Sequence, residues 1–308
     1  MTALFDTHAH LQDPAFDRDR DAAFARARAA GVSELVVVGE DEPSSAAAVV
    51  LAAHYPGEVW ATAGLHPHKA KRADRAFPSR LRALAQHPSV RAIGEIGLDF
   101  HYDRSPRPVQ AEVFRAQLAV AAELDLPVAI HSREAEAETL TILAAWSAAR
   151  HRAGARAPLG VMHCFGYGEE AAIRFVELGF MVSIPGTVTF PKADLVRAVA
   201  RAVPAAALVI ETDAPVLAPV PFRGKRNEPA YLAHTAQTVA ELRGLSVEEL
   251  GRLTSANARH LYRIADCGLR IADWAAPRAP SAAPDATGTG APNPQSAIRN
   301  PQSGDVSA

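Results

Sequence analysis

Short apolar and β-branched runs alternate along this chain with longer stretches whose apolar positions recur at helical spacing. Eight such runs can be distinguished, and each has the length of a strand. They are ALFDTHAH from Ala3, ELVVVG from Glu34, VWATAG from Val59, VRAIGEIG from Val90, PVAIHS from Pro127, LGVMHC from Leu159, GFMVSI from Gly179 and ALVIET from Ala207.

Eight helix candidates lie between and after these runs, and several begin at a proline or end near a glycine. They span Asp17 to Ala30, Ser44 to His54, Pro78 to Gln86, Val109 to Leu124, Ala135 to Arg150, Gly168 to Leu178, Lys192 to Val203 and Pro229 to Leu242. Repeated strand and helix pairs are typical of a parallel sheet covered by helices. The pattern therefore predicts an α/β fold, a (β/α)8 TIM barrel.

The composition changes after about Ile271, where Pro, Ala, Gly, Ser and Thr dominate and NPQS occurs twice. Such a segment cannot bury enough apolar surface to offset its ordering entropy. We predict a barrel domain over residues 1–265 and a disordered low-complexity tail over residues 273–308.

The charge is balanced, with 32 basic and 34 acidic side chains among 308 residues and a net charge of -2. No global positive field draws the chain to nucleic acid, so any phosphate binding must be local. The two cysteines, Cys164 and Cys267, suit a reducing compartment. With no signal peptide and no apolar stretch long enough to span a bilayer, we expect a cytoplasmic protein without a membrane partner. A monomer is expected.

The first apolar run ends on two histidines, His8 and His10, and residues two apart in a strand project to the same side. Both imidazoles can therefore reach one ion. The pattern is weak alone, because two histidines on one face of a strand also occur by chance.

Four further candidates support it, each at the carboxyl end of an apolar run. They are Glu95, His131, His163 and Asp213. In a barrel that end of the strands is the catalytic face, so six residues remote in sequence would meet at one mouth. Each alone could be an ordinary buried polar residue, but burying all six without a cation would leave charges uncompensated.

The six residues suit two divalent ions. Imidazole favours Zn, Mn, Co or Fe-type ions, while the two carboxylates also allow Mg, so the identity of the metal stays open. Glu95 is the natural bridging ligand because a carboxylate has two oxygens. A water held between two such ions would supply hydroxide near neutral pH.

Seven motifs then carry a resemblance: DTHAHL, GLHPH, IGEIGLDFHY, PVAIHSREA, HCF, ETDAP and PFRGKRNEP. In this order and spacing they resemble the TatD family of metal-dependent deoxyribonucleases, within the amidohydrolase-like barrels, over roughly Leu4 to Tyr262. The resemblance implies a metallo-dependent hydrolase barrel. It also implies that His8, His10, Glu95 and Asp213 bind one ion and that Glu95, His131 and His163 bind the second.

The same resemblance implies DNA as substrate, with nucleotides removed from an end by in-line attack of a metal-bridged hydroxide. Glu95 and Asp213 would be the catalytic carboxylates, and Asp213 would accept a proton as well as bind metal. A deacylase or amidohydrolase acting on an ester or amide, for example an aminoacyl-tRNA, is the alternative. A noncatalytic binding barrel is disfavoured by the intact ligand set.

Candidate substrate-binding residues surround the predicted metals. Arg133 could hold a phosphate oxygen or pair with a neighbouring glutamate, and His66 could touch substrate, support a ligand or stabilise a turn. Arg223, Lys225 and Arg226 form a basic loop after the eighth run, which could bind a polyanion or be merely solvated. The tryptophans and phenylalanines show no interleaved stacking pattern, so no single-strand platform is evident. Cys164 is not expected to be a nucleophile, because it points away from its neighbour His163.

Overall fold

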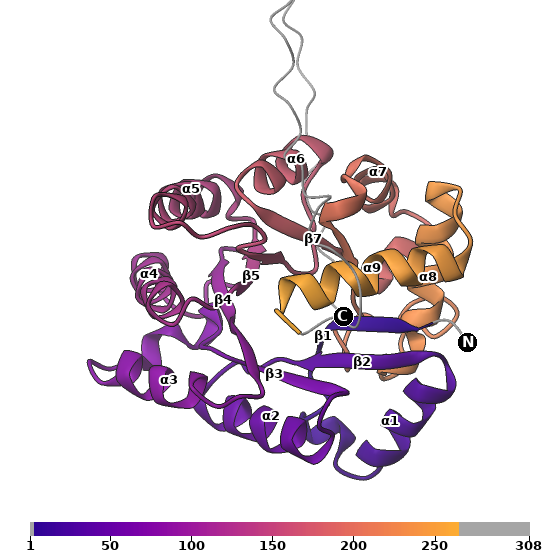
Figure 1. Ribbon diagram of the computed structural model, residues 1–308, viewed down its shortest axis with the longest axis horizontal. Helices are drawn as coiled ribbons and strands as arrows, with labels where there is room; N and C mark the ends of the chain where they lie inside the picture. Colours follow the sequence, from indigo (N-terminus) through magenta and orange to yellow (C-terminus); the bar gives the residue numbers. More distant parts are fainter. Residues whose placement is uncertain (1–2, 265–308) are drawn as a thin grey trace, which may run out of the picture. The chain divides into compact units, whose positions relative to one another are not determined.

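The computed structural model describes residues 3–264, which form a barrel of eight parallel strands surrounded by helices (Figure 1). Each strand pairs with the next along the chain, in the order β1 to β8. The strands are β1 (Leu4–Ala9), β2 (Val32–Val37), β3 (Val59–Ala63), β4 (Val90–Asp99), β5 (Val128–Arg133), β6 (Gly160–Met162), β7 (Phe180–Ile184) and β8 (Leu208–Ile210). The predicted TIM barrel is confirmed; the predicted tail and Cys267 lie outside the described residues.

The segment that follows β8 closes the barrel against β1. Ala9 and Ala214 form a parallel bridge, the His10 amide donates to the carbonyl of Ala214 at 2.7 Å, and the Asp213 amide donates to the carbonyl of His8 at 2.9 Å. Closure of the barrel therefore places Asp213 beside the two histidines of β1.

Helices cover the outside of the barrel and follow the predicted order. They are α1 (Arg20–Ala29), α2 (Glu42–His54), α3 (Phe77–Ala85), α4 (Arg107–Glu123), α5 (Glu136–Arg152), α6 (Glu169–Glu177), α7 (Asp194–Ala202) and α8 (Leu232–Arg243). Five helices begin one to three residues later than predicted, and short 3-10 turns precede two of these five, α1 and α8. Residues Pro14–Phe16 form such a turn before α1, and Pro229–Tyr231 form another before α8.

A ninth helix, α9 (Val247–Leu261), was not predicted. It begins with a capping box in which Ser246 Oγ accepts from the Glu249 amide at 3.1 Å and the Ser246 amide donates to the Glu249 carboxylate at 2.8 Å. Figure 1 shows α9 lying across the barrel, and its last turn packs on the barrel interior.

Two apolar layers result, one between strands and helices and one inside the barrel. The inner layer takes its side chains from the strands and from the end of α9, namely Phe5, Val36, Val38, Ala92, Ala129, Val161, Met181, Val209, Ala258, Leu261 and Tyr262. This filled interior supports the strand ends where the candidate site lies. No helix within residues 3–264 has both the length and the apolar character needed to cross a bilayer.

Candidate metal centre

The end of β1 supplies the first pair of imidazoles, as the spacing of His8 and His10 predicts. Their Nε2 atoms lie 3.2 Å apart. His10 Nδ1 lies 2.9 Å from the carbonyl oxygen of Val38, which can only accept, so this nitrogen carries the proton. The Nε2 of His10 is thereby left as the metal-binding nitrogen, facing His8.

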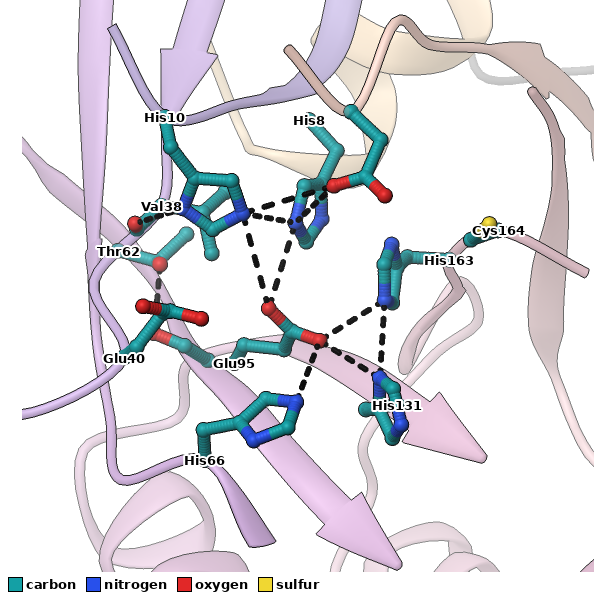
Figure 2. A network of polar contacts seen from close by, with 12 residues as sticks. His8, His10, Val38, Glu40, Thr62, His66, Glu95, His131, His163 and Cys164 are labelled. Atoms are coloured by element: carbon teal, nitrogen blue, oxygen red, sulfur yellow. Dashed lines mark hydrogen bonds and ion pairs between the residues drawn. The ribbon is translucent and has the colours of Figure 1, made fainter. Parts of the chain in front are cut away.

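Glu95 lies at the centre of the cluster, on β4, with its two oxygens turned to different neighbours (Figure 2). Its Oε2 lies 3.5 Å from His8 Nε2 and 3.9 Å from His10 Nε2. Its Oε1 lies 2.8 Å from His131 Nδ1 and 2.9 Å from His163 Nε2. One carboxylate thus joins two pairs of imidazoles, which is the arrangement expected of a bridging ligand.

A glycine allows the strand that carries Glu95 to approach its neighbour. Gly97 of β4 has φ +143°, and a Cβ there would lie 1.9 Å from the carbonyl oxygen of His131 on β5. Any side chain at this position would push the two strands apart. Gly97 therefore sets the distance between Glu95 and His131.

Asp213 reaches the cluster from the segment that closes the barrel. Its Oδ1 lies 3.5 Å from His10 Nε2 and 3.8 Å from His8 Nε2. Its backbone has φ +57°, and the residue is buried. The structure therefore brings all six predicted ligands together, in two groups that share Glu95.

Within the cluster, carboxylates and imidazoles stabilise each other's charged forms strongly enough to outweigh the effect of burial on their pKa values. Burial opposes charge on Glu95, yet the neighbouring His163 and His66 hold its pKa well below the usual range. Burial likewise opposes charge on His163, yet Glu95 and Glu211 hold its pKa well above the usual range. The pKa of His10 is raised to about 9, because contact with Asp213 and the charge of Glu40 outweigh burial. The carboxylates of the cluster therefore favour positive charge beside them, which protonated imidazoles or a bound cation can supply.

The donor set fits divalent metal ions. Four groups of three residues have ligand atoms within 4.8 Å of one another. They are His8, Glu95 and His163; His8, His10 and Asp213; His66, Glu95 and His131; and His10, Glu40 and Glu95. Imidazole nitrogens and carboxylate oxygens this close together are suitable ligands for ions of the Zn or Mn type. These buried clusters are consistent with a metal site.

Two of these residues were not predicted as ligands. His66 Nε2 lies 3.3 Å from Glu95 Oε1, so His66 adjoins the cluster itself. Glu40 belongs to one of the groups and follows β2 in the sequence. A carboxylate just beyond the second apolar run was the signal that could have found it.

Asp99 was also missed, although it lies on β4 four residues after Glu95. Its Oδ2 lies 3.0 Å from His131 Nε2 and 3.0 Å from His68 Nε2. Asp99 therefore holds the ring nitrogen of His131 that is turned away from Glu95. The spacing of two and four residues along a strand was a usable signal.

Glu211 was missed in the same way, two residues before Asp213. It is fully buried, and its Oε1 accepts from the Cys164 amide at 2.6 Å and lies 3.4 Å from His163 Nδ1. Such a carboxylate behind a histidine orients the ring and raises its basicity.

The four basic residues predicted to bind substrate differ in whether they form ion pairs. Arg133 is exposed, with Cζ 4.9 Å from the centre of the Tyr102 ring. Arg223 lies with Cζ 4.2 Å from the Phe190 ring, and Lys225 Nζ lies 5.8 Å from the Phe222 ring. None of the three forms an ion pair within residues 3–264.

Arg226 is engaged. Its Nη1 and Nη2 lie 2.6 and 2.9 Å from the two carboxylate oxygens of Asp19, and its guanidinium covers Phe16. These contacts favour a structural role for Arg226, which differs from both the substrate-binding and the solvated role considered for this loop from the sequence.

Cys164 follows His163 with φ +44° and is partly buried. Burial and the surrounding carboxylates hold the pKa of its thiol well above the usual range. A thiol in this state is a poor nucleophile, in agreement with the sequence-based expectation.

Comparison with known proteins points to the same family that the sequence motifs resemble. Residues 5–263 match the model of the family described as TatD related DNase. A Bacillus subtilis protein named "Uncharacterized metal-dependent hydrolase YabD" is 41% identical over 261 residues, which cover 85% of this chain and 99% of the relative. A Pectobacterium atrosepticum protein named "3'-5' ssDNA/RNA exonuclease TatD" is 38% identical over 267 residues, with 85% and 100% covered.

The fold is similar to a solved structure as well. The crystal structure of YjjV, a TatD homologue from Escherichia coli K12, superposes with a TM-score of 0.78 at 30% identity. The match covers 85% of this chain and 98% of that one.

Proposed function

Since this chain belongs to the TatD family of metal-dependent hydrolases, we propose that it hydrolyses phosphodiester bonds of single-stranded nucleic acid, removing nucleotides from an end. The observation that supports this most directly is Glu95, whose two oxygens face two separate pairs of imidazoles. Two ions held a few ångströms apart are the usual device for displacement at phosphorus.

In this proposal the six residues divide between two ions. His8, His10, Glu95 and Asp213 would hold one ion, and Glu95, His131 and His163 would hold the other. When bound, divalent ions at such a site act as Lewis acids toward a phosphoryl oxygen and acidify water.

The chain's own groups then have defined tasks. The bond from His10 to Val38, and the contact of Asp99 with His131, hold each ring with one nitrogen toward Glu95. The pKa of Asp213 is lowered, because contact with His10 and the charge of His163 outweigh burial, so its carboxylate is ionised near neutral pH. It can therefore accept a proton at an oxygen from the attacking water.

One experiment tests the proposal. Metal-free protein is incubated with end-labelled single-stranded and duplex oligonucleotides while Mg, Mn, Zn or Co is added one at a time. We expect a ladder that shortens from one end of the single strand with at least one of the ions. Absence of cleavage with every ion, combined with turnover of an ester or amide such as an aminoacyl-tRNA, would overturn the proposal in favour of a deacylase.

Asp213→Asn refines this test. Loss of a proton acceptor lowers turnover by about 100- to 10,000-fold, whereas Glu112→Gln on the exposed face of α4 is the matched control without effect. Nearly full turnover by Asp213→Asn, with metal still bound, would remove Asp213 from proton transfer.

A further inference from the structure

An exposed tyrosine stands beside the metal centre, in the segment between β4 and α4. Tyr102 is 49% exposed. No task in the proposed reaction has been assigned to it. It is not part of either apolar layer of the barrel.

The position of Tyr102 is fixed relative to the cluster. Its amide donates to Asp99 Oδ1 at 2.8 Å, and the other oxygen of the same carboxylate lies 3.0 Å from both His68 and His131. The ring centroid of Tyr102 lies 5.4 Å from that of His68, which lies 6.3 Å from that of His131. The exposed ring is therefore separated from a proposed metal ligand by one imidazole.

Two arginine side chains lie close to the ring of Tyr102. Arg104 has Cζ 5.1 Å from the centre of the Tyr102 ring, and Arg133 has Cζ 4.9 Å from it. Both are exposed, and neither forms an ion pair with a carboxylate anywhere in residues 3–264.

The acidic residues next to them in sequence have other partners. Asp103 is bound by Arg107 at 2.7 Å, and Glu134 is bound by His101 at 2.6 Å. Arg104 and Arg133 thus add two positive charges without an ion-pair partner among the described residues, at the edge of the proposed site for a polyanion.

We propose that Tyr102, Arg104 and Arg133 form a platform for an unpaired nucleobase, in which the tyrosine ring stacks on the base and the arginines bind the adjoining phosphates. We call these three residues the Tyr102 platform. The inference rests on the proposed function, and it adds the reason why the substrate is a single strand. A base held against Tyr102 cannot at the same time be paired in a duplex.

The chemistry of the platform favours this ligand over a solvated surface. Every base has a π face that stacks on an aromatic ring, and this contact tolerates all sequences. An arginine on an exposed ring is held weakly, so a base can displace it. The displaced guanidinium matches the geometry of a phosphate.

The test measures binding apart from hydrolysis. The dissociation constant of a ten-nucleotide single strand with an internal fluorescein is measured by anisotropy in EDTA, where no cleavage occurs. A series of strands carries one abasic position each, moved inward from either end. We expect wild-type protein to bind about 5- to 100-fold more weakly when the abasic position is one of the two nucleotides at the end that is cleaved.

Tyr102→Ala should bind the intact strand more weakly by a similar factor and should no longer distinguish that abasic strand from the intact one. Tyr102→Phe keeps the ring and should bind like wild type. Arg104→Ala and Arg133→Ala should each lower the slope of log affinity against log salt by about 0.7, the value for one phosphate of a single strand. Arg152→Ala, at the exposed end of α5, is the matched control and should leave the slope unchanged.

Two results overturn the inference. In the first, Tyr102→Ala binds the intact strand as tightly as wild type does. In the second, Tyr102→Ala binds every abasic strand more weakly than wild type does, and by the same factor wherever the abasic position lies. If either occurs while wild-type protein still shortens single strands, only the platform is wrong. If wild-type protein neither binds nor cleaves single strands, the proposed function fails first.

Discussion

Two carboxylates, Asp99 and Glu211, stand behind the imidazoles that face Glu95. Each contacts the nitrogen of a histidine that is turned away from the centre, at 3.0 Å for His131 and 3.4 Å for His163. Metal-binding histidines commonly have such a partner, and its loss costs about 10- to 100-fold in metal affinity.

We therefore expect Glu211→Gln to weaken binding of the ion held by His163 by about 10- to 100-fold. The side-chain carbonyl of the glutamine can still accept a hydrogen bond from the backbone amide of Cys164, so the local fold should persist. The negative charge beside His163 is lost. Competition with a chelating dye measures the change, with Glu112→Gln as control. Unchanged metal affinity would mean that Glu211 serves the backbone alone.

Arg226 and Arg223 lie three residues apart in one loop and are expected to behave differently. Arg226→Ala removes the bonds to Asp19 and should lower the melting temperature, whereas Arg223→Ala removes no ion pair and should weaken substrate binding. The pKa of Asp19 is held well below its usual range by hydrogen bonds from Arg226 and Arg26.

The sign of the pH dependence follows from that lowered pKa. The contribution of Asp19 to stability is present above its unfolded pKa of about 3.9 and is lost as the pH falls toward its folded value. The difference in melting temperature between wild type and Arg226→Ala should therefore shrink between about pH 5 and pH 2. A difference that stays constant over this range would assign the effect to packing on Phe16.

The proposed ligands were predictable because each lies at the end of an apolar run, where the barrel topology alone brings them together. Tyr102 was not, because its neighbours Arg104 and Arg133 come from different strand ends and their approach depends on side-chain geometry. Asp99 and Glu211 act through histidines, and the only sequence signal for them was their spacing of four and two residues from the predicted ligands Glu95 and Asp213.

At the scale of elements, the strands were the most predictable part. Each is buried and rich in apolar residues, so its run is unbroken in the sequence, as in LVV of β2 or FMV of β7. Helix α9 was missed although Ser246 and Glu249 carry a capping signal. Eight pairs of strand and helix already complete a barrel, so the pattern requires no further helix. The position of α9 against the barrel interior depends on contacts between residues remote in sequence.

The last turn of α9 nevertheless completes the barrel core. Leu261 is fully buried in the inner layer, and Tyr262 Oη donates to the carbonyl of Thr7 at 2.9 Å. We expect Leu261→Ala to lower the free energy of unfolding by about 2–5 kcal/mol, since it opens a cavity among packed side chains.

Urea denaturation measures this loss, and Arg252→Ala on the exposed face of the same helix is the control, expected within about 0.5 kcal/mol of wild type. A loss below about 1 kcal/mol would show that α9 is not part of the cooperative core.

At the scale of the whole molecule, the chain is nearly neutral, with a net charge of -2. Attraction of the proposed polyanionic substrate would therefore depend on local groups of basic residues. The same fold gathers histidines and carboxylates from the ends of seven strands in one cluster, where protons and metal ions would compete for the same atoms.

That competition makes stability depend jointly on metal and pH. In metal-free protein the pKa of His10 is about 9, because Asp213 and Glu40 outweigh burial. A histidine with a raised pKa contributes stability that is fully present below its unfolded pKa of about 6.5 and is lost as the pH rises through its folded pKa. A divalent ion needs the neutral imidazole, so the loaded protein does not suffer this loss.

We therefore expect saturating metal to raise the melting temperature at every pH, and to raise it more as the pH increases from about 6.5 to about 9. At 100 times the dissociation constant, the gain corresponds to about 2.7 kcal/mol. Scanning fluorimetry of stripped and reloaded protein across this range measures the difference. His10→Ala should flatten its pH dependence, whereas a difference that shrinks with rising pH would show that protons at His10 do not compete with the metal.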